Sequence, residues 1–346
     1  MESANPVQRE RIPSAPPLIQ PLPDTVSRPL WSVMIPVFNC SSFIPEALAS
    51  VLAQDAGETE MQIEVVDDCS TDADVEALVK RIGGGRVGYF RQPKNVGSLR
   101  NFETCINRSK GILVHLLHGD DKVKPGFYSK MQTLFETCPE AGAAFSRYDF
   151  INEAGVKTHT VAPEAKQEGI LPNWLLRIAE RQRTQYAATV VKREVYERLG
   201  GFYGMTYAED WEMWVRIARY YPVAYSPLSL AEYRVHKQSI SSDKVSHGKA
   251  VDDYLKAIHA IQQHLPEEHR QRLLRIAKKD CAFFNIMAAE RNWQEEGNKK
   301  TAREELKTAL RFSKHPQVLF HLLKTCLKVT IGLRLLLFCT QNLFSV

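Results

Sequence analysis

The sequence lacks the patterns that mark several protein classes. Its seven cysteines are scattered and form no Cys-x-x-Cys pair, which argues against a zinc site or a disulfide framework and suits a reducing compartment. Basic and acidic residues nearly balance, at 45 to 40, and no basic run is interleaved with aromatics, so nucleic acid is not an expected partner. No stretch reaches the roughly 18 uncharged residues that a membrane span needs. We expect a globular, cytoplasmic protein.

The first 30 residues are rich in proline and hold no apolar stretch of signal-peptide length. Within them, PSAPPLIQPLPD (13–24) is typical of an extended chain with little fixed structure. We therefore expect a disordered leader over 1–30 and folded structure from Trp31 onward.

From Trp31, short apolar strands alternate with amphipathic helices. Strands that alternate with helices of about ten residues indicate an α/β fold with a mainly parallel sheet flanked by helices. A β-hairpin is predicted over 141–155, with its turn near 152–155. The predicted strands are 31–39, 63–72, 87–93 and 111–117, and the helices between them are 42–54, 72–82 and 98–109.

Three of these strands end in polar side chains, at Phe38–Asn39, Asp67–Asp68 and Asp120–Asp121. Ligands of parallel sheets bind beyond the carboxyl ends of the strands, so the three clusters should face one crevice. Two adjacent carboxylates are tolerable there if a divalent cation lies between them and a phosphate, and oxygen ligands suit Mg²⁺ or Mn²⁺. Taken alone, Asp120–Asp121 could equally open a solvated turn, but three polar strand ends together favour the metal.

The segment from Trp31 to about His236 resembles a family 2 glycosyltransferase of the GT-A fold. The matching pieces stand in the usual order: SVMIPVFNCSSFIPEALASVLAQ, IEVVDDCSTD, NVGSLRNFETCINRSKG, LLHGDD, AEDWEMWVRIA and YRVH. This family transfers a sugar from a nucleotide diphosphate donor to an acceptor hydroxyl, usually with inversion, and uses Mg²⁺ or Mn²⁺. The resemblance implies an inverting, metal-dependent enzyme with a UDP-sugar donor and a glycan, polysaccharide or lipid-linked acceptor.

The resemblance also implies a role for each matching side chain. Asp210, paired with Glu209, corresponds to the catalytic base, and Asp121 and His236 correspond to metal ligands. His118 departs from the pattern, because many members carry an acid at that position. Contacts with the nucleotide sugar are implied for Pro36, Val37, Phe38, Asn39, Asp67, Asp68, Asn95, Gly97, Arg100 and Asp120.

The chemistry favours Asp210 independently of the family. An acceptor hydroxyl has a pKa far above 7 and needs a positioned base to take its proton. Asp210 stands at the start of a predicted helix whose apolar face includes Trp211 and Trp214. The alternative is that Asp210 only caps this helix, and a helix N-terminus lowers a carboxylate's pKa, which opposes basicity.

Two other function classes stay open. A non-catalytic, nucleotide-sugar-binding member of the family would have lost the acids or the base, and both are present. A nucleotidyltransferase would need a glycine-rich phosphate loop and a lysine after the first strand, where this sequence has PVFNCSSF (36–43).

The sequence divides into a catalytic domain over 31–245 and a helical C-terminal region over 246–346, with helices over 247–293 and 296–312. Its tail, 317–344, is strongly apolar but interrupted by Lys324, Lys328 and Arg334. This pattern is typical of a helix that lies on an anionic membrane, and equally of a terminal helix docked on protein. Peripheral contact with the inner face of the membrane is therefore one of two alternatives.

Overall fold

The structure is a computed structural model that describes residues 11–239 and 250–331, without the side chains of residues 295 and 296. The chain forms two compact units. The first comprises Met1–Trp174 and Arg183–His236, and the second comprises Leu175–Gln182 and Lys237–Val346, within the described ranges. The first unit thus ends at His236, where the sequence suggested a boundary at 245.

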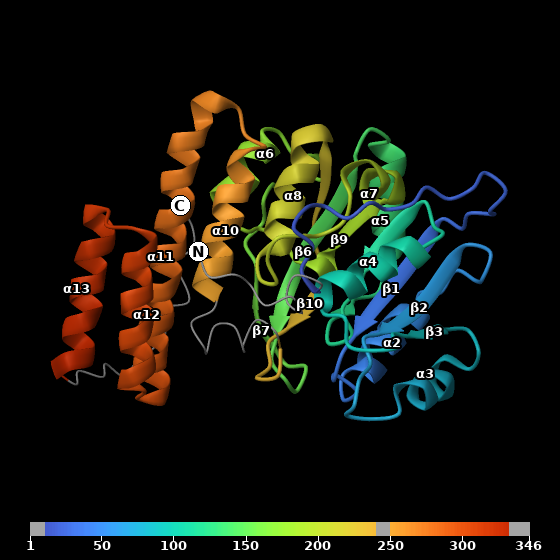
Figure 1. Cartoon of the computed structure of the whole chain (residues 1–346), viewed down its shortest axis with the longest axis horizontal. Coiled ribbons are helices and arrows are strands. Elements are labelled where there is room, and N and C mark those ends of the chain that lie inside the picture. Colours follow the sequence, from blue (N-terminus) through green and yellow to red (C-terminus); the bar gives the residue numbers. More distant parts are fainter. Residues whose placement is uncertain (1–10, 240–249, 332–346) are drawn as a thin grey trace. The chain divides into compact units, whose positions relative to one another are not determined.

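The first unit is built on a ten-stranded mixed sheet (Figure 1). Strands β3, β2, β1 and β4 run parallel, and β9 pairs antiparallel with β4 and β6. The mainly parallel α/β sheet expected from the sequence is confirmed. The strand order is β3 (Gly88–Arg91), β2 (Met61–Asp67), β1 (Trp31–Val37), β4 (Leu113–Leu116), β9 (Thr189–Lys192), β6 (Ala143–Ile151), β10 (Val223–Arg234) and β5 (Lys122–Val123), with β7 (Lys157–Thr160) beside β6 and β8 (Gly169–Ile170) beside β10.

Helices cover both faces of the parallel part of this sheet. The odd-numbered side chains of β1 join one apolar cluster with α2, α3 and α5, whereas α4 packs on β1, β2 and β4. Because successive side chains of a strand point to opposite faces, all seven residues of β1 are buried. The helices of the first unit are α2 (Ile44–Leu52), α3 (Val75–Gly83), α4 (Ser98–Arg108), α5 (Phe127–Thr137), α7 (Arg193–Leu199) and α8 (Glu209–Tyr220), with a 3₁₀ turn at Tyr186–Ala188, whereas α6 (Trp174–Glu180) lies in the second unit from Leu175 onward.

The leader is ordered from residue 11, so the expectation of disorder is wrong for residues 11–30. Ile19 is only 2% exposed. The backbone N–H of Gly201 donates to Pro17 O at 2.8 Å, and that of Gly204 donates to Pro13 O at 2.8 Å. An extended, proline-rich chain leaves its carbonyl groups unpaired, and here the folded unit uses them as acceptors. Residues 1–10 lie outside the described part of the chain.

The described part of the second unit is helical. It contains α10 (Ala250–Gln262), α11 (Glu267–Glu296), α12 (Lys299–Phe312) and α13 (Pro316–Ile331), and α11 packs against the other three (Figure 1). The helical region is therefore confirmed, with a break before Glu267 where Pro266 stands at the helix start. No helix within 11–239 or 250–331 combines the length and hydropathy needed to cross a membrane. The last part of the predicted tail, from residue 332, lies outside the described residues.

Candidate active site

The polar strand ends lie side by side, as the parallel arrangement predicts. Val37, the last residue of β1, is in register with Asp67, the last residue of β2. The N–H of Asp68 donates to Val37 O at 2.8 Å, and the N–H of Gly119 donates to Pro36 O at 3.2 Å. A Cβ at position 119 would lie 2.9 Å from the Val37 side chain, so only glycine permits this approach.

Asp67 is fully buried and already engaged by the protein. It accepts hydrogen bonds from Tyr89 Oη at 2.7 Å, Arg91 Nη1 at 2.5 Å and Ser70 N at 2.8 Å. A carboxylate offers about four acceptor positions, so little capacity remains for a ligand. Tyr89 and Arg91 were missed from the sequence, although their spacing of two places both side chains on one side of β3.

Asp68 orders the loop that leads into α4. Its carboxylate accepts the N–H groups of Val96 at 2.6 Å and Gly97 at 2.9 Å, and Asn95 Nδ2 donates to its carbonyl at 3.2 Å. Burial raises the pKa of Asp68, although the two backbone hydrogen bonds oppose the rise. Gly97 has φ of 90°, which favours glycine at this start of α4.

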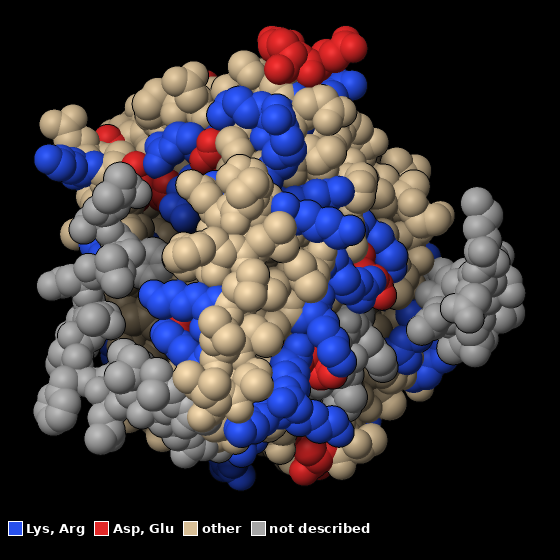
Figure 2. Space-filling view, turned by 90° about the vertical axis from the view of Figure 1, so that its left-hand side faces the viewer, with Lys and Arg blue, Asp and Glu red and all other residues tan. Residues whose placement is uncertain are grey.

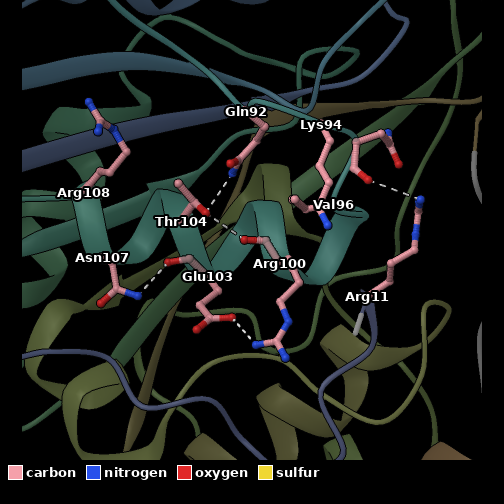
Figure 3. A pocket seen from close by; sticks show the side chains of 10 residues that line it. Arg11, Gln92, Lys94, Val96, Arg100, Glu103, Thr104, Asn107 and Arg108 are labelled. Atoms are coloured by element: carbon pink, nitrogen blue, oxygen red, sulfur yellow. Dashed lines mark hydrogen bonds and ion pairs between the residues drawn. The ribbon is translucent and has the colours of Figure 1, made fainter. Parts of the chain in front are cut away.

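A cavity of about 580 Å³ opens beside Asn95 and along α4 (Figure 3). Arg11 reaches it from the leader, where its Nη1 donates to Asn95 O at 3.4 Å. Arg100 also lines it and is paired with Glu103 at 2.7 Å. Four cations and one carboxylate make the lining positive, which suits an anionic ligand. The lining residues are Arg11, Gln92, Lys94, Asn95, Val96, Arg100, Glu103, Thr104, Asn107 and Arg108.

The stretch 36–39 divides between strand and surface. Pro36 and Val37 are buried within β1, whereas Phe38 is 48% exposed and Asn39 is partly exposed. Asn39 has φ of 49° and its Oδ1 accepts the N–H of Thr71 at 2.8 Å. A ligand at this end of β1 would therefore meet Phe38 and Asn39 first, and Pro36 and Val37 position them from below.

A compact cluster of possible metal ligands follows β4. One ligand atom from each of His118, Asp120 and Asp121 lies within 4.8 Å of the others. His236 joins the cluster, with its Nε2 at 3.0 Å from Asp120 Oδ2. The structure therefore brings Asp120, Asp121 and His236 together, as the sequence predicted, and adds His118.

The pKa values of the two carboxylates in this cluster are shifted in opposite directions. Burial, and next the charge of Asp120, raise the pKa of Asp121 well above its usual range. Burial also tends to raise the pKa of Asp120, but the hydrogen bond from His236 and the nearby His118 outweigh it and lower that pKa. A divalent cation between the two would relieve their repulsion, so the donor set fits Mg²⁺ or Mn²⁺.

His118 has an unsatisfied nitrogen at this place. Its ring packs against Phe102 at 5.1 Å and Tyr186 at 4.4 Å between centroids. Its Nε2 is buried and has no hydrogen-bond partner among the described residues. Buried polar atoms are rarely left unpaired, so an imidazole with an unpaired nitrogen in this cluster also fits a metal-ligating position.

Arg234 holds the cluster in shape. Its side chain is fully buried, its Nε donates to Asp120 O at 2.8 Å, and its backbone N–H donates to Asp121 Oδ1 at 2.8 Å. Its Nη2 also pairs with Glu46 Oε2 at 3.0 Å. The end of β10 is thereby tied to the end of β4. Arg234 lies in the YRVH motif, but the sequence singled out only His236 there.

Asp210 lies in the first turn of α8 and is 4% exposed. It is not the N-cap residue: that residue is Ala208, with φ of 64°, and Asp210 Oδ1 accepts the next backbone N–H, that of Trp211, at 2.8 Å. The capping alternative is therefore wrong. Burial, and next the charge of Glu209, raise the pKa of Asp210 well above its usual range, which outweighs the lowering expected at a helix start.

Tyr186 connects the start of α8 to the acidic cluster. Its Oη donates to Glu209 Oε1 at 3.1 Å, while its ring contacts His118 at 4.4 Å between centroids. Glu209, the residue before Asp210, is thus linked to His118 of the cluster through the side chain of Tyr186. Trp211 and Trp214 are 1% and 4% exposed and belong to the core, as expected.

Comparisons with known proteins agree with this architecture. Residues 32–191 match the family model "Glycosyl transferase family 2". A Bacillus subtilis protein assigned to teichuronic acid biosynthesis as a glycosyltransferase, TuaG, is 28% identical over 233 residues, which cover 63% of this chain and 83% of the relative.

Two solved structures share the fold. Staphylococcus aureus TarS 1–349 in complex with UDP-GlcNAc is 17% identical with a TM-score of 0.58, over 82% of this chain and 80% of that one. The mannosyltransferase PcManGT from Pyrobaculum calidifontis, in complex with GDP-Man and Mn²⁺, is 17% identical with a TM-score of 0.55, over 95% and 92%. Residues 32–191, which contain the parallel strands β1 to β4 and the strand-end acids, belong to glycosyltransferase family 2.

Proposed function

We propose that the protein transfers a sugar from a nucleotide diphosphate donor to an acceptor hydroxyl, with inversion of configuration and with the help of Mg²⁺ or Mn²⁺. The proposed donor is a UDP-sugar. The observation that carries the proposal is the cluster of His118, Asp120 and Asp121 within 4.8 Å at the end of β4. A diphosphate leaving group gathers negative charge, and a divalent cation supplies Lewis-acid stabilisation of it.

The donor is assigned to the crevice at the strand ends. Asn39, Asp68, Asn95 and Arg100 surround the ends of β1 and β2 and the start of α4, and the positive lining of the adjoining cavity suits a nucleotide. The related structures support a nucleotide sugar, since one holds UDP-GlcNAc and another holds GDP-Man with Mn²⁺. Asp67 would act mainly by fixing Arg91 and Tyr89 at the edge of this site.

The metal ligands are proposed to be Asp121 and His236, with Asp120 and His118 completing the set. His236 Nε2 and Asp120 Oδ2 lie 3.0 Å apart, so each orients the other. Arg234 fixes the Asp121 carboxylate through its backbone N–H and the backbone carbonyl of Asp120 through its guanidinium group.

Asp210 is proposed as the base that takes the proton of the acceptor hydroxyl. Its raised pKa supports this role, because a base works best when its pKa approaches the working pH. Attack from the side opposite the leaving diphosphate inverts the configuration at the sugar carbon. The acceptor is proposed to be a glycan, a polysaccharide or a lipid-linked hydroxyl, which the similarity to the teichuronic acid relative supports.

The test is a thermal unfolding screen with nucleotide sugars, each with Mn²⁺ and with EDTA. A donor at 100 times its Kd should add about 2.7 kcal/mol of stability, and only when Mn²⁺ is present. Asp121→Ala should lose this stabilisation while its unliganded fold persists. Asp24→Ala, at an exposed carboxylate, serves as the control and should keep it.

Equal stabilisation with Mn²⁺ and with EDTA would contradict metal-dependent binding. Stabilisation by free nucleotide monophosphates but by no nucleotide sugar would argue against transfer and for a binding role.

A further inference from the structure

Helix α13 of the second unit presents an unusual exposed apolar face. Leu319, Leu323, Leu327 and Ile331 follow one another at intervals of four and are 37%, 60%, 57% and 69% exposed, and Phe320 beside them is 66% exposed. Residues at this spacing share one side of a helix. A contiguous apolar surface of this kind marks an interaction site in a folded protein.

The face is not required for packing within the unit. The opposite side of α13 carries the buried residues Val318, Thr325 and Val329, and the helix packs there against α11 and α12. Lys328 forms an ion pair with Glu290 of α11 on the same side. The helix is thus anchored by one face while the other, apolar face remains outside.

The surroundings of this face are positively charged. Residues 306–346 contain six Lys or Arg and neither Asp nor Glu. Figure 2 shows an uncharged strip bordered on both sides by more Lys and Arg than Asp and Glu. Lys324 stands in α13 between Leu323 and Leu327 of the apolar face.

We propose that the exposed face of α13 docks on a membrane surface that carries anionic lipid headgroups. An amphipathic helix with Leu and Phe on one side and flanking Lys binds such surfaces, with its apolar side chains in the interface and its cations on the headgroups. The charge selects this occupant. A second copy docked through the same face would bring two positively charged borders together. Residues 332–346 contain Arg334 and no acidic residue, so they would not neutralise the positive charge around the face either.

The proposal is tested by sedimentation of the full chain with vesicles of phosphatidylcholine alone and with added phosphatidylglycerol. Binding should require phosphatidylglycerol and weaken with salt. The double variant Phe320→Ser/Leu323→Ser should lower the partition coefficient tenfold or more, because two half-exposed apolar side chains no longer enter the interface. Lys324→Gln should lower it by a factor of about five, the contribution of one cation near an anionic surface.

The control is Leu18→Ser/Leu228→Ser, two exposed leucines of the first unit, which should bind vesicles like the parent chain. Circular dichroism and melting temperature establish that each variant keeps its helices. Equal vesicle binding of the Phe320/Leu323 variant and the parent would overturn the proposal, as would absence of binding by the parent. The proposal would also be overturned if, without lipid, the parent chain sedimented as a dimer and the Phe320/Leu323 variant as a monomer, since a second copy would then cover the face.

Discussion

His236 Nε2 lies 3.0 Å from Asp120 Oδ2, although 116 positions separate the two residues. The contact joins the end of β10 to the end of β4 and places an imidazole on one of two adjacent carboxylates. The ring of Phe43 packs on His236 with 4.5 Å between centroids, which restricts its orientation.

We predict that His236→Ala weakens Mn²⁺-dependent donor binding by roughly 10- to 100-fold, the usual cost of losing a group that ligates or orients at a metal site. His236→Gln keeps a hydrogen-bond donor for Asp120 and should lose less. Titration calorimetry with donor and Mn²⁺ measures both variants. His315→Ala, at an exposed histidine of the second unit, is the control; an unchanged donor Kd in His236→Ala would remove this residue from the site.

The leader is predicted to stabilise the first unit through Ile19. Ile19 is 2% exposed and its neighbour Leu18 is 76% exposed. Ile19→Ala should therefore cost about 2–4 kcal/mol of unfolding free energy, the range for large-to-small changes in a core. Leu18→Ala should stay within about 0.5 kcal/mol. Urea unfolding of the two variants measures the difference, and equal midpoints would show that the leader does not contribute to the folded unit.

The second unit is predicted to gain stability on mild acidification through Glu305. Burial raises the pKa of Glu305 to about 7 from an ordinary value of 4.5, against the opposing charge of Arg291. The pKa of Glu305 is higher in the folded than in the unfolded chain. Its contribution to stability is therefore greatest below about pH 4.5, falls as the pH rises toward 7, and is constant above that. The full swing is on the order of 3 kcal/mol.

Glu305→Gln should remove this fall and leave the unit more stable than the parent at pH 8. Glu304→Gln is a matched control, because Glu304 is 61% exposed and pairs only at the surface with Lys307. Urea unfolding at pH 5 and pH 8 measures all three chains. A parent chain with the same pH dependence as Glu305→Gln would contradict the assignment.

The sequence predicted the parts of the site that local patterns encode. Alternating apolar residues mark β1 and β2, and the acids after them mark strand ends that a parallel sheet must align. The fold class, the strand positions and the grouping of Asp120 with Asp121 follow from these signals.

The remaining features depend on contacts between distant residues. Arg234 contacts Asp120, 114 positions away in the sequence, and no local sequence pattern predicts this contact. Arg11 reaches Asn95 from a proline-rich segment that has no helical or strand pattern of its own. The left-handed Ala208 is the N-cap, two residues before the Asp210 that was the capping alternative, and Asp210 lies buried in the first turn.

The central claim is tested most directly by the turnover of Asp210→Asn. Asparagine keeps the shape and the oxygen that accepts the Trp211 N–H. The melting temperature should therefore barely change, and the donor Kd should stay within a few-fold of the parent value. The change removes the proton acceptor. With the nucleotide sugar that stabilises the protein in the unfolding screen as donor, kcat for release of nucleoside diphosphate should fall by roughly 10²- to 10⁴-fold. Glu209→Gln, which retains an acceptor for Tyr186, should lose less. Near-normal turnover in Asp210→Asn, with a folded and donor-binding protein, would contradict the assignment of Asp210 as the base.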